Sequence, residues 1–284
     1  MFLDSCKAPV LDLYYLATLP KRRQSSAQMQ KDHKTPVMVL FYHRVANTSP
    51  NDWTISPEQF RRQISWVRER YDIVSLHDAQ LRIGADDNKR PTVCITFDDG
   101  YADNCETAVP WMLDQEIPFT YFVTSNHVQS GEPFAHDVAA GNPLKPNTIE
   151  QIHEMASAGV EIGAHSRTHT DLGQLENEQM LFDEIVGSKR DLEEMLDRPV
   201  RYIAFPFGMP SNMSTAAFRI AFQAGLWGAC SAYGGYNMPG DDPFHLQRIH
   251  GDPQWARFRN WLTVDPRKLS QKRQFDPGDY RICF

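Results

Sequence analysis

A regular alternation of apolar segments with amphipathic helical segments is the strongest constraint on the fold. Strands are expected at 37–45, 73–76, 93–97, 119–123, 160–164, 202–205, 226–230 and 246–249. Helices are expected from Ser56 onward and at 104–115, 148–158, 176–196 and 214–224. Such alternation is typical of a parallel sheet. About seven strands approach a closed barrel, with an open doubly wound sheet as the alternative. No Gly-x-Gly-x-x-Gly follows a strand, so no dinucleotide is indicated.

Polar residues gather directly after these strands. His43, the pair Asp98 and Asp99, His165 and the dipeptide Phe207-Gly208 each follow an apolar run. The carboxyl ends of parallel strands share one rim of a barrel, where function is found. The sequence therefore predicts that these residues meet at one rim.

The stretch from Val93 to Tyr101 leads from a strand straight into two carboxylates and a glycine. Adjacent side chains at a strand end point in different directions, so Asp98 and Asp99 can do different jobs. One can bind a cation while the other holds a proton. A helix-capping turn of the Asp-Asp-Gly type is the alternative reading.

A second cluster, His165-Ser166-Arg167-Thr168-His169, follows the strand at 160–164. Two histidines four residues apart can bind one metal ion. Together with a carboxylate from another strand end they offer two nitrogens and one oxygen. That set leaves positions open for water and substrate, as a catalytic divalent metal requires.

These motifs together carry a resemblance to a known family. Thr96-Phe97-Asp98-Asp99-Gly100, followed by His165 and His169, resembles the polysaccharide deacetylases with a NodB homology domain, carbohydrate esterase family 4. The similarity runs from about Pro36 to Asp252. The segments at 39–45 and 56–76 look most like the branch acting on poly-N-acetylglucosamine. The resemblance implies an α/β fold, a distorted (β/α)7 barrel.

The resemblance also implies roles for single residues. Asp99, His165 and His169 would hold a divalent metal, with zinc preferred, and Asp98 would be the general base. In Ala204-Phe205-Pro206-Phe207-Gly208, which matches a further family motif, Pro206 and Phe207 would line the substrate groove, and Phe207 would offer a backbone N–H to the oxyanion. Ala204 departs from the family, which often has Arg there, and Arg248 is a candidate to replace it.

The general acid would be a histidine from a late strand. His250 follows the strand at 246–249 and is expected at the rim, with Asp252 as a partner. His245 is the rival, but it precedes the strand and is expected at the opposite end of the barrel.

Further contacts to substrate are expected at the same rim. His43, Tyr233 and Arg248 are candidate substrate-binding residues. Tyr233 belongs to the loop at 231–237, for which a plain turn is the alternative. Within the long insertion at 129–147, Phe134-Ala135-His136-Asp137 is expected to form a rim contact or a partial lid, with ordinary loop structure as the alternative.

Composition limits the partners and the compartment. The 284-residue chain has a net charge of −7, so nucleic acid is not expected. Its five cysteines show no Cys-x-x-Cys. No transmembrane segment or good signal peptide is seen, which predicts a cytoplasmic protein, or one peripheral to the inner membrane face. Residues 9–19, followed by a basic triplet, are expected to form a weak membrane-surface helix, with a docking helix or a frayed terminus as the alternatives.

We therefore expect an N-terminal extension and linker at 1–35, a catalytic domain at 36–263 and a C-terminal tail at 264–284. The expected function is metal-dependent removal of N-acetyl groups from N-acetylhexosamine units of a polysaccharide or its precursor. The alternatives are a related hydrolase of a small non-sugar amide, a glycosidase using Asp98, and a non-catalytic carbohydrate-binding barrel.

Overall fold

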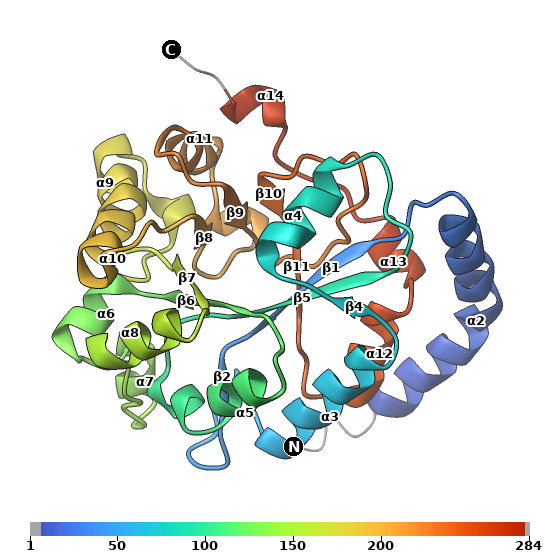
Figure 1. Ribbon diagram of the computed structural model, residues 1–284, viewed down its shortest axis with the longest axis horizontal. Coiled ribbons are helices and arrows are strands. Elements are labelled where there is room, and N and C mark those ends of the chain that lie inside the picture. Colours follow the sequence, from blue (N-terminus) through green and yellow to red (C-terminus); the bar gives the residue numbers. More distant parts are fainter. Residues whose placement is uncertain (1–6, 282–284) are drawn as a thin grey trace.

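The computed structural model describes residues 7–281. Its centre is a set of parallel strands surrounded by helices (Figure 1). Around the sheet, in the order β10-β9-β8-β7-β6-β5-β1-β11, lie β10 (His245–Leu246), β9 (Gly228–Cys230), β8 (Tyr202–Ala204), β7 (Glu161–Ala164), β6 (Thr120–Val123), β5 (Thr92–Phe97), β1 (Val37–Tyr42) and β11 (Arg248–His250). The short β4 (Asp72–Ile73) adds to β5, and β2 (Arg44–Val45) pairs separately with β3 (Thr54–Ile55).

One short segment of chain, residues 245–250, nearly closes the ring. Its first half, β10, pairs with β9, and its second half, β11, pairs with β1. Only Gln247 separates the two halves. If β10 and β11 are counted as one strand, seven strands surround the axis, which confirms the predicted distorted (β/α)7 barrel.

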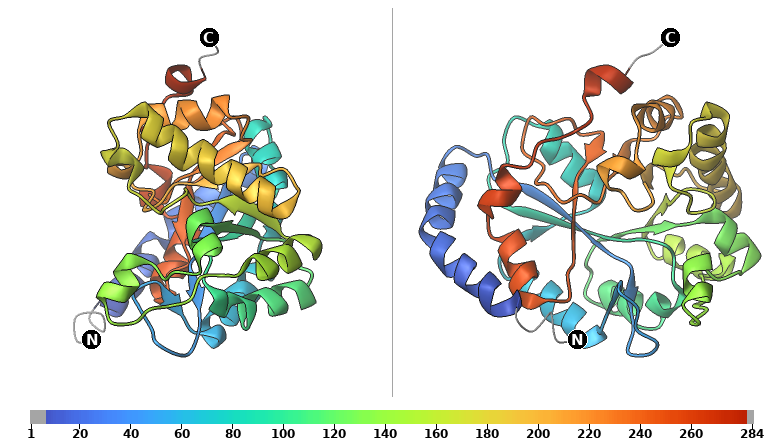
Figure 2. Two further views of the ribbon diagram at one scale, coloured as in Figure 1. Left: turned by 90° about the vertical axis from the view of Figure 1, so that its left-hand side faces the viewer. Right: turned by 180° about the vertical axis from the view of Figure 1, so that it is seen from behind.

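Helices cover the outside of the strands, as the two further views show (Figure 2). They are α3 (Pro57–Arg68), α5 (Ala108–Asp114), α8 (Ile149–Ser157), α9 (Glu178–Phe182), α10 (Ser188–Leu196), α11 (Thr215–Gln223) and α12 (Trp255–Leu262). Local signals start two of them. Ser56 and Thr148 accept hydrogen bonds from the backbone three residues on and form capping boxes with Gln59 and Gln151.

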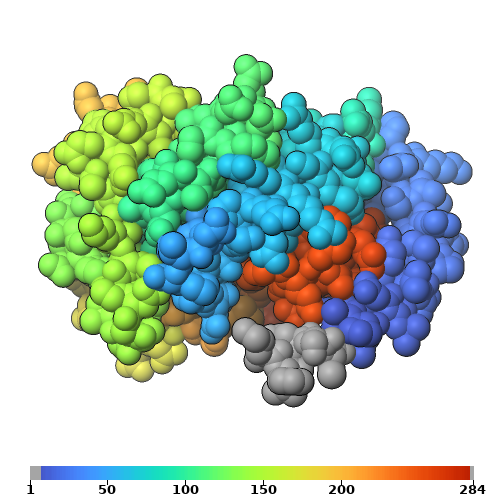
Figure 3. Space-filling model, turned by 90° about the horizontal axis from the view of Figure 1, so that it is seen from below, coloured from blue at the N-terminus to red at the C-terminus, as the bar shows by residue number. Residues whose placement is uncertain are grey.

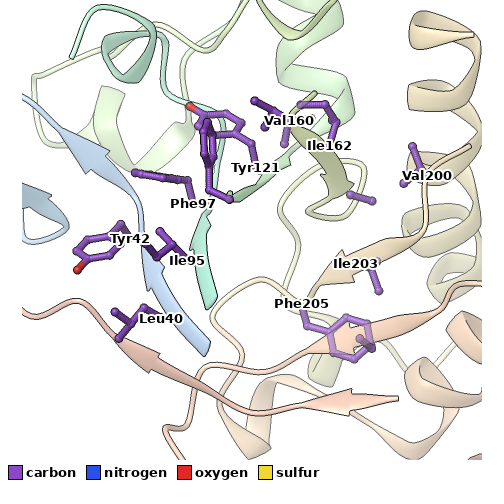
Figure 4. Packing of buried hydrophobic residues seen from close by; sticks show 14 of the residues in the cluster. Leu40, Tyr42, Ile95, Phe97, Tyr121, Val160, Ile162, Val200, Ile203 and Phe205 are labelled. Carbon is purple, nitrogen blue, oxygen red and sulfur yellow. The ribbon is translucent and has the colours of Figure 1, made fainter. Parts of the chain in front are cut away.

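Side chains alternate between two cores along each strand. On β1, Val37 and Val39 face the barrel interior, whereas Met38, Leu40 and Tyr42 pack outward against the helices. Figure 4 shows part of this outer core, including Leu40, Ile95 and Phe97. Both faces of the strands are buried, so the strands read as nearly continuous apolar runs.

Helix α4 (Leu76–Gly84), which the sequence analysis did not anticipate, covers one mouth of the barrel. Leu76, Ala79 and Ile83 join the interior core beside Val37 and Val39. Val37 lies at the start of β1, so α4 covers the amino ends of the strands. The polar residues that follow the strands lie at the other mouth of the barrel, at the carboxyl ends of the strands.

The polar second part of the N-terminal extension at 1–35, residues 24–35, was expected to be a linker, but the structure shows a helix over most of it. Residues Lys7–Lys31 form one helix, α2, that packs along α12 (Figure 3). Arg22 attaches this helix to α12. Its guanidinium is 2% exposed and donates to the backbone and side-chain oxygens of Asn260 at 2.8 and 2.7 Å. It also lies 3.5 Å from Asp265. In the first half of α2, Tyr14 donates to Asp265 at 2.7 Å and the backbone oxygen of Leu11 accepts from Asn260 at 3.0 Å. Residues 9–19 therefore dock on the barrel, which is one of the alternatives stated for them.

The expected C-terminal tail also packs on the barrel, through α13 (Pro266–Leu269) and α14 (Pro277–Tyr280). Phe275 and Tyr280 lie with their ring centroids 4.8 and 5.2 Å from that of Phe218, and Tyr280 is fully buried. Arg273 donates to the backbone oxygen of His245 at 2.6 Å.

The proposed domain limits stay a prediction. Among residues 7–281, no helix is both long and apolar enough to cross a membrane.

Replacing Arg22 with Ala should lower the free energy of unfolding by about 3 kcal/mol, because Asp265 and the oxygens of Asn260 would lose a buried cationic partner. Chemical denaturation followed by circular dichroism measures the change. Exposed Arg23 on the same helix is the matched control, and Arg23→Ala should stay within about 0.5 kcal/mol of wild type. Equal effects of the two substitutions would contradict the docking role of Arg22.

Candidate active site

A cavity of about 630 Å³ opens at the carboxyl ends of the strands. Its lining residues come from β1 and β11, from the segments that follow β1, β5, β7, β8 and β9, from the loop between β2 and β3 and from the insertion after β6. They are Phe41, His43, Trp53, Asp98, Asp99, His136, His165, His169, Phe205, Phe207, Met209, Asn212, Ala232, Arg248 and His250. All the polar residues expected at one rim on the basis of strand ends, with Phe207, are therefore brought together.

Asp99, His165 and His169 converge at the floor of this cavity. Nε2 of His165 and Nε2 of His169 each lie 3.2 Å from Oδ1 of Asp99. One ligand atom from each residue lies within 4.8 Å of the other two. Oδ1 of Asp99 is buried, yet neither imidazole makes a well-oriented hydrogen bond to it. Three donor atoms that point toward a common centre instead of toward each other suit a divalent cation.

The surroundings prepare these side chains as ligands. Nδ1 of His165 lies 2.8 Å from the backbone oxygen of Ala204, which fixes the tautomer and leaves Nε2 free for a metal. Burial alone would raise the pKa of Asp99, but His43 and the two other histidines hold that pKa well below its ordinary value. Asp99 is therefore ionised at neutral pH, as a metal ligand must be.

Strained backbone places several of these side chains. Nine described residues other than glycine have positive φ angles, and four of them lie in or beside the site: Asp99 (72°), Ser166 (57°), His169 (61°) and Phe207 (59°). Asp98 continues the inward side of β5, so regular strand geometry would turn Asp99 outward. The left-handed conformation at Asp99 turns it back into the cavity. Such strain costs of the order of 1 kcal/mol or more per residue and concentrates at functional sites.

Glu184 holds the loop that carries both histidines. Its carboxylate accepts hydrogen bonds from the backbone N–H groups of Arg167 and Thr168, both at 3.0 Å, and from the Thr168 hydroxyl at 2.6 Å. Glu184 lies in a π-helical turn, η3 (Asp183–Gly187), between α9 and α10. Helical periodicity predicts a regular helix there, so the sequence analysis missed this residue.

Asp98 and Arg248, which both line the cavity, form a buried ion pair. The two guanidinium N–H groups donate to Oδ1 and Oδ2 of Asp98 at 2.6 and 2.7 Å, and a further donor bonds the backbone oxygen of Ser231 at 2.9 Å. Burial alone would raise the pKa of Asp98, but Arg248, together with the nearby His165 and His43, lowers that pKa overall. Arg248 is fully buried and each of its three guanidinium nitrogens donates a hydrogen bond within the protein, so its position favours an orienting role over the expected contact with substrate.

The two late-strand histidines lie in different environments. His250 lines the cavity, with its Nδ1 4.0 Å from the Asp252 carboxylate. Burial, followed by the nearby His43, lowers the pKa of His250 to about 4. His245 instead faces out of the barrel, where its Nε2 lies 3.0 Å from the Ser231 hydroxyl. The side chains alternate inward at Leu246, Arg248 and His250, which explains this separation.

The same alternation turns two expected substrate contacts, Tyr233 and Pro206, away from the cavity. Tyr233 belongs to the outer core, and its hydroxyl lies 3.3 Å from Nε2 of His245. Ala232, the preceding residue, lines the cavity instead. Pro206 is buried and does not line the cavity, whereas Phe207 does and is 53% exposed. No acceptor in the described part of the chain bonds the backbone N–H of Phe207.

His43 sits beside the candidate metal ligands. It lines the cavity, and its Nδ1 is buried without a hydrogen-bond partner among the described residues. Burial lowers the pKa of His43. The sequence analysis missed Trp53, whose ring centroid lies 4.7 Å from that of His43. No strand end marks Trp53, because it lies in the loop between β2 and β3.

Comparisons with known proteins agree with this geometry. The sequence profile of the polysaccharide deacetylases matches residues 85–226. The poly-beta-1,6-N-acetyl-D-glucosamine N-deacetylase of Staphylococcus aureus is 24% identical over 242 residues, which cover 79% of this chain and 81% of the relative. YxkH of Bacillus subtilis, whose name assigns it provisionally to the polysaccharide deacetylases, is 26% identical over 72% of this chain and 69% of its own.

Solved structures share the barrel. The structure of IcaB from Ammonifex degensii superposes with a TM-score of 0.66 at 23% identity, covering 81% of this chain and 97% of the other. The deacetylase PplD of Streptococcus pyogenes, solved with acetate, has the same TM-score at 20% identity, covering 81% and 98%. The profile match spans half of the sequence and includes Asp98, Asp99, His165, His169 and Phe207. This chain belongs to the polysaccharide deacetylase family.

Proposed function

We propose that this protein is a metal-dependent hydrolase that removes N-acetyl groups from N-acetylhexosamine units of a polysaccharide or its precursor. The observation that carries the proposal is the convergence of Asp99, His165 and His169 beside the Asp98–Arg248 pair. The name of the Staphylococcus aureus relative supports an N-acetylglucosamine polymer as substrate. A complete set of candidate catalytic groups favours this function over a non-catalytic binding barrel.

Asp99, His165 and His169 would hold the metal ion. Two imidazole nitrogens and one carboxylate oxygen suit zinc and leave positions open for other ligands. When bound, the ion supplies Lewis acidity, which promotes deprotonation of water and polarises the acetyl carbonyl. The carbonyl oxygen of Ala204 and the carboxylate of Glu184 keep the ligands in place.

Asp98 would accept the proton from the attacking water. Arg248 orients both carboxylate oxygens and keeps Asp98 ionised, so the carboxylate can act as a base. The N–H of Phe207 would stabilise negative charge on the carbonyl oxygen as the tetrahedral intermediate forms. Both groups are held before substrate binds, so little reorganisation is needed during the reaction.

His250 would donate a proton to the departing amine nitrogen. With its pKa near 4, the resting imidazole is neutral at neutral pH. It must therefore gain its proton during turnover. The proton that Asp98 takes from water would pass to His250 and from there to the amine nitrogen, which returns both side chains to their resting forms. The amine and acetate leave as products.

Purified protein should release acetate from β-1,6-linked N-acetylglucosamine oligomers and should lose this activity in a chelator. Metal analysis by plasma mass spectrometry should find about one zinc ion per chain, as expected for one three-ligand site. His165→Ala should lose both the ion and the activity, because it removes one of three ligands.

The exposed His153 on α8 provides the control for this substitution, and His153→Ala should keep both metal and activity. Equal metal content in His165→Ala and wild type would refute the ligand assignment. Acetate release that persists after complete metal removal would refute the mechanism.

Asp98→Asn should lower kcat by about 10²-fold or more, the usual scale for a lost general base, while the metal stays bound. Steady-state kinetics and metal content are measured on the same preparation. Circular dichroism checks folding, since the substitution leaves Arg248 without its ionised partner. If Asp98→Asn lost the metal and Asp99→Asn kept it, the two aspartates would have exchanged roles.

His250→Ala should also lower kcat by about 10²-fold or more with metal retained, because the amine would leave without its proton donor. His245→Ala should change kcat much less, since His245 lies outside the barrel interior. Rates are compared at equal concentrations of folded protein. A larger kcat loss in His245→Ala than in His250→Ala would reassign the acid.

A further inference from the structure

His136 lies at the rim of the cavity and has no part in the mechanism above. It belongs to α7 (Ala135–Ala139), within the insertion between β6 and β7. Its side chain is 47% exposed, lines the cavity and lies 6.0 Å from the candidate ligand His169, measured between ring centroids. A substrate whose acetyl group reaches the metal site would therefore pass close to His136.

Buried partners fix the orientation of His136. The Tyr101 hydroxyl donates to Oδ2 of Asp137 at 2.9 Å, and its oxygen lies 3.2 Å from Nε2 of His136. Since Tyr101 gives its own proton to Asp137, it accepts the proton of His136 Nε2. Tyr101 is fully buried and Asp137 is 2% exposed. This assignment leaves Nδ1 of His136 as a hydrogen-bond acceptor without a partner among the described residues.

The same carboxylate reaches the loop that carries Trp53. Asn51 donates to Oδ1 of Asp137 at 3.3 Å, and Asn142 of the insertion donates to the Ser49 backbone at 3.0 Å. Arg44, 1% exposed, also donates to the Ser49 backbone at 2.8 Å. The insertion and the loop at 46–54 are thus joined, and each presents one ring at the rim.

The two rings belong to different walls of the cavity. Trp53 is 46% exposed, and its ring centroid lies 5.8 Å from that of His250. The ring of His136 instead contacts the rings of Phe134 and His169. A pyranose ring has an apolar face that packs on an aromatic side chain and hydroxyl groups at its edge. One wall offers the aromatic face and the other a hydrogen-bond acceptor.

We propose that His136 is a specificity-determining residue that accepts a hydrogen bond from the sugar hydroxyl next to the acetamido group, the 3-hydroxyl of an N-acetylglucosamine unit. Tyr101 and Asp137 position it, and Trp53 packs on the sugar ring. The inference rests on the proposed function and narrows its substrate from amides in general to pyranose N-acetylhexosamines with a free neighbouring hydroxyl.

His136→Phe tests the contact, because it keeps a ring on Phe134 and removes both nitrogens. For β-1,6-linked N-acetylglucosamine oligomers, KM should rise about tenfold with kcat nearly unchanged, as expected when a substrate hydrogen bond is lost. Metal content should not change. His127→Phe is the matched control, because His127 also packs on Phe134 (ring centroids 4.1 Å apart) but does not line the cavity.

Oligomers built from 3-deoxy N-acetylglucosamine identify the partner of His136. With the wild-type enzyme they should show a KM about tenfold higher than the parent oligomers, and with His136→Phe the two substrates should have equal KM. If the 3-deoxy penalty persists in His136→Phe, another residue binds the hydroxyl and the proposal is wrong.

Tyr101→Phe tests the positioning role. It should raise KM less than His136→Phe does, and it should have no further effect on KM in the His136→Phe background, since it acts through His136. Additive effects of the two substitutions would refute this link. An enzyme that releases no acetate from the parent oligomers would refute the proposed function itself. Acetate release with an unchanged KM in His136→Phe would refute only the present inference.

Discussion

Pairing of one short segment with two neighbours determines both the barrel and its proposed chemistry. Within residues 245–250, β10 pairs with β9 and β11 pairs with β1, and these two pairings nearly close the ring of strands. The same pairing sets Arg248 opposite Val39, facing inward, and brings its guanidinium to Asp98 at the end of β5. A shift of one residue in this register would turn Arg248 and His250 outward together, because side chains alternate along a strand.

The ion pair between Asp98 and Arg248 is buried, and its burial carries a free-energy cost. Taking two charges out of water costs several kcal/mol per ion, and only good geometry and further hydrogen bonds repay that cost. The forked contact and the bond from Arg248 to the Ser231 backbone meet this condition. The guanidinium also lies 4.9 Å from the ring centroid of Phe41, which adds a cation–π contact. We therefore assign this ion pair the role of fixing the orientation of Asp98, in preference to a role in stabilising the fold.

The rest of the site depends on departures from regular backbone. Left-handed residues at Asp99, His169 and Phe207 bring side chains or N–H groups into the cavity that regular strand geometry would turn away. Glu184 in its π-helical turn holds the loop that carries His169, and the buried Tyr121 donates a hydrogen bond to the backbone oxygen of Tyr101, two residues after Asp99. The barrel supplies a rigid frame, and a few buried polar groups stabilise the loops above it.

Local sequence determined the alternation of strands and helices, and with it the barrel, because apolar periodicity reflects which face of each element is buried. It also determined the residue types after each strand, so Asp98, Asp99, His165 and His169 could be recognised together. Strand alternation, read strictly, would have favoured Ala232 over Tyr233 at the cavity.

Only the tertiary structure decided the partners of these residues. Arg248 meets Asp98 across 150 residues of sequence, and Asp137 meets Asn51 across 86. Helices α4 and α12 and the docking of α2 likewise depend on surfaces that exist only after the barrel has formed. Contacts of this kind follow from strand register and chain closure, which no local pattern of residues encodes.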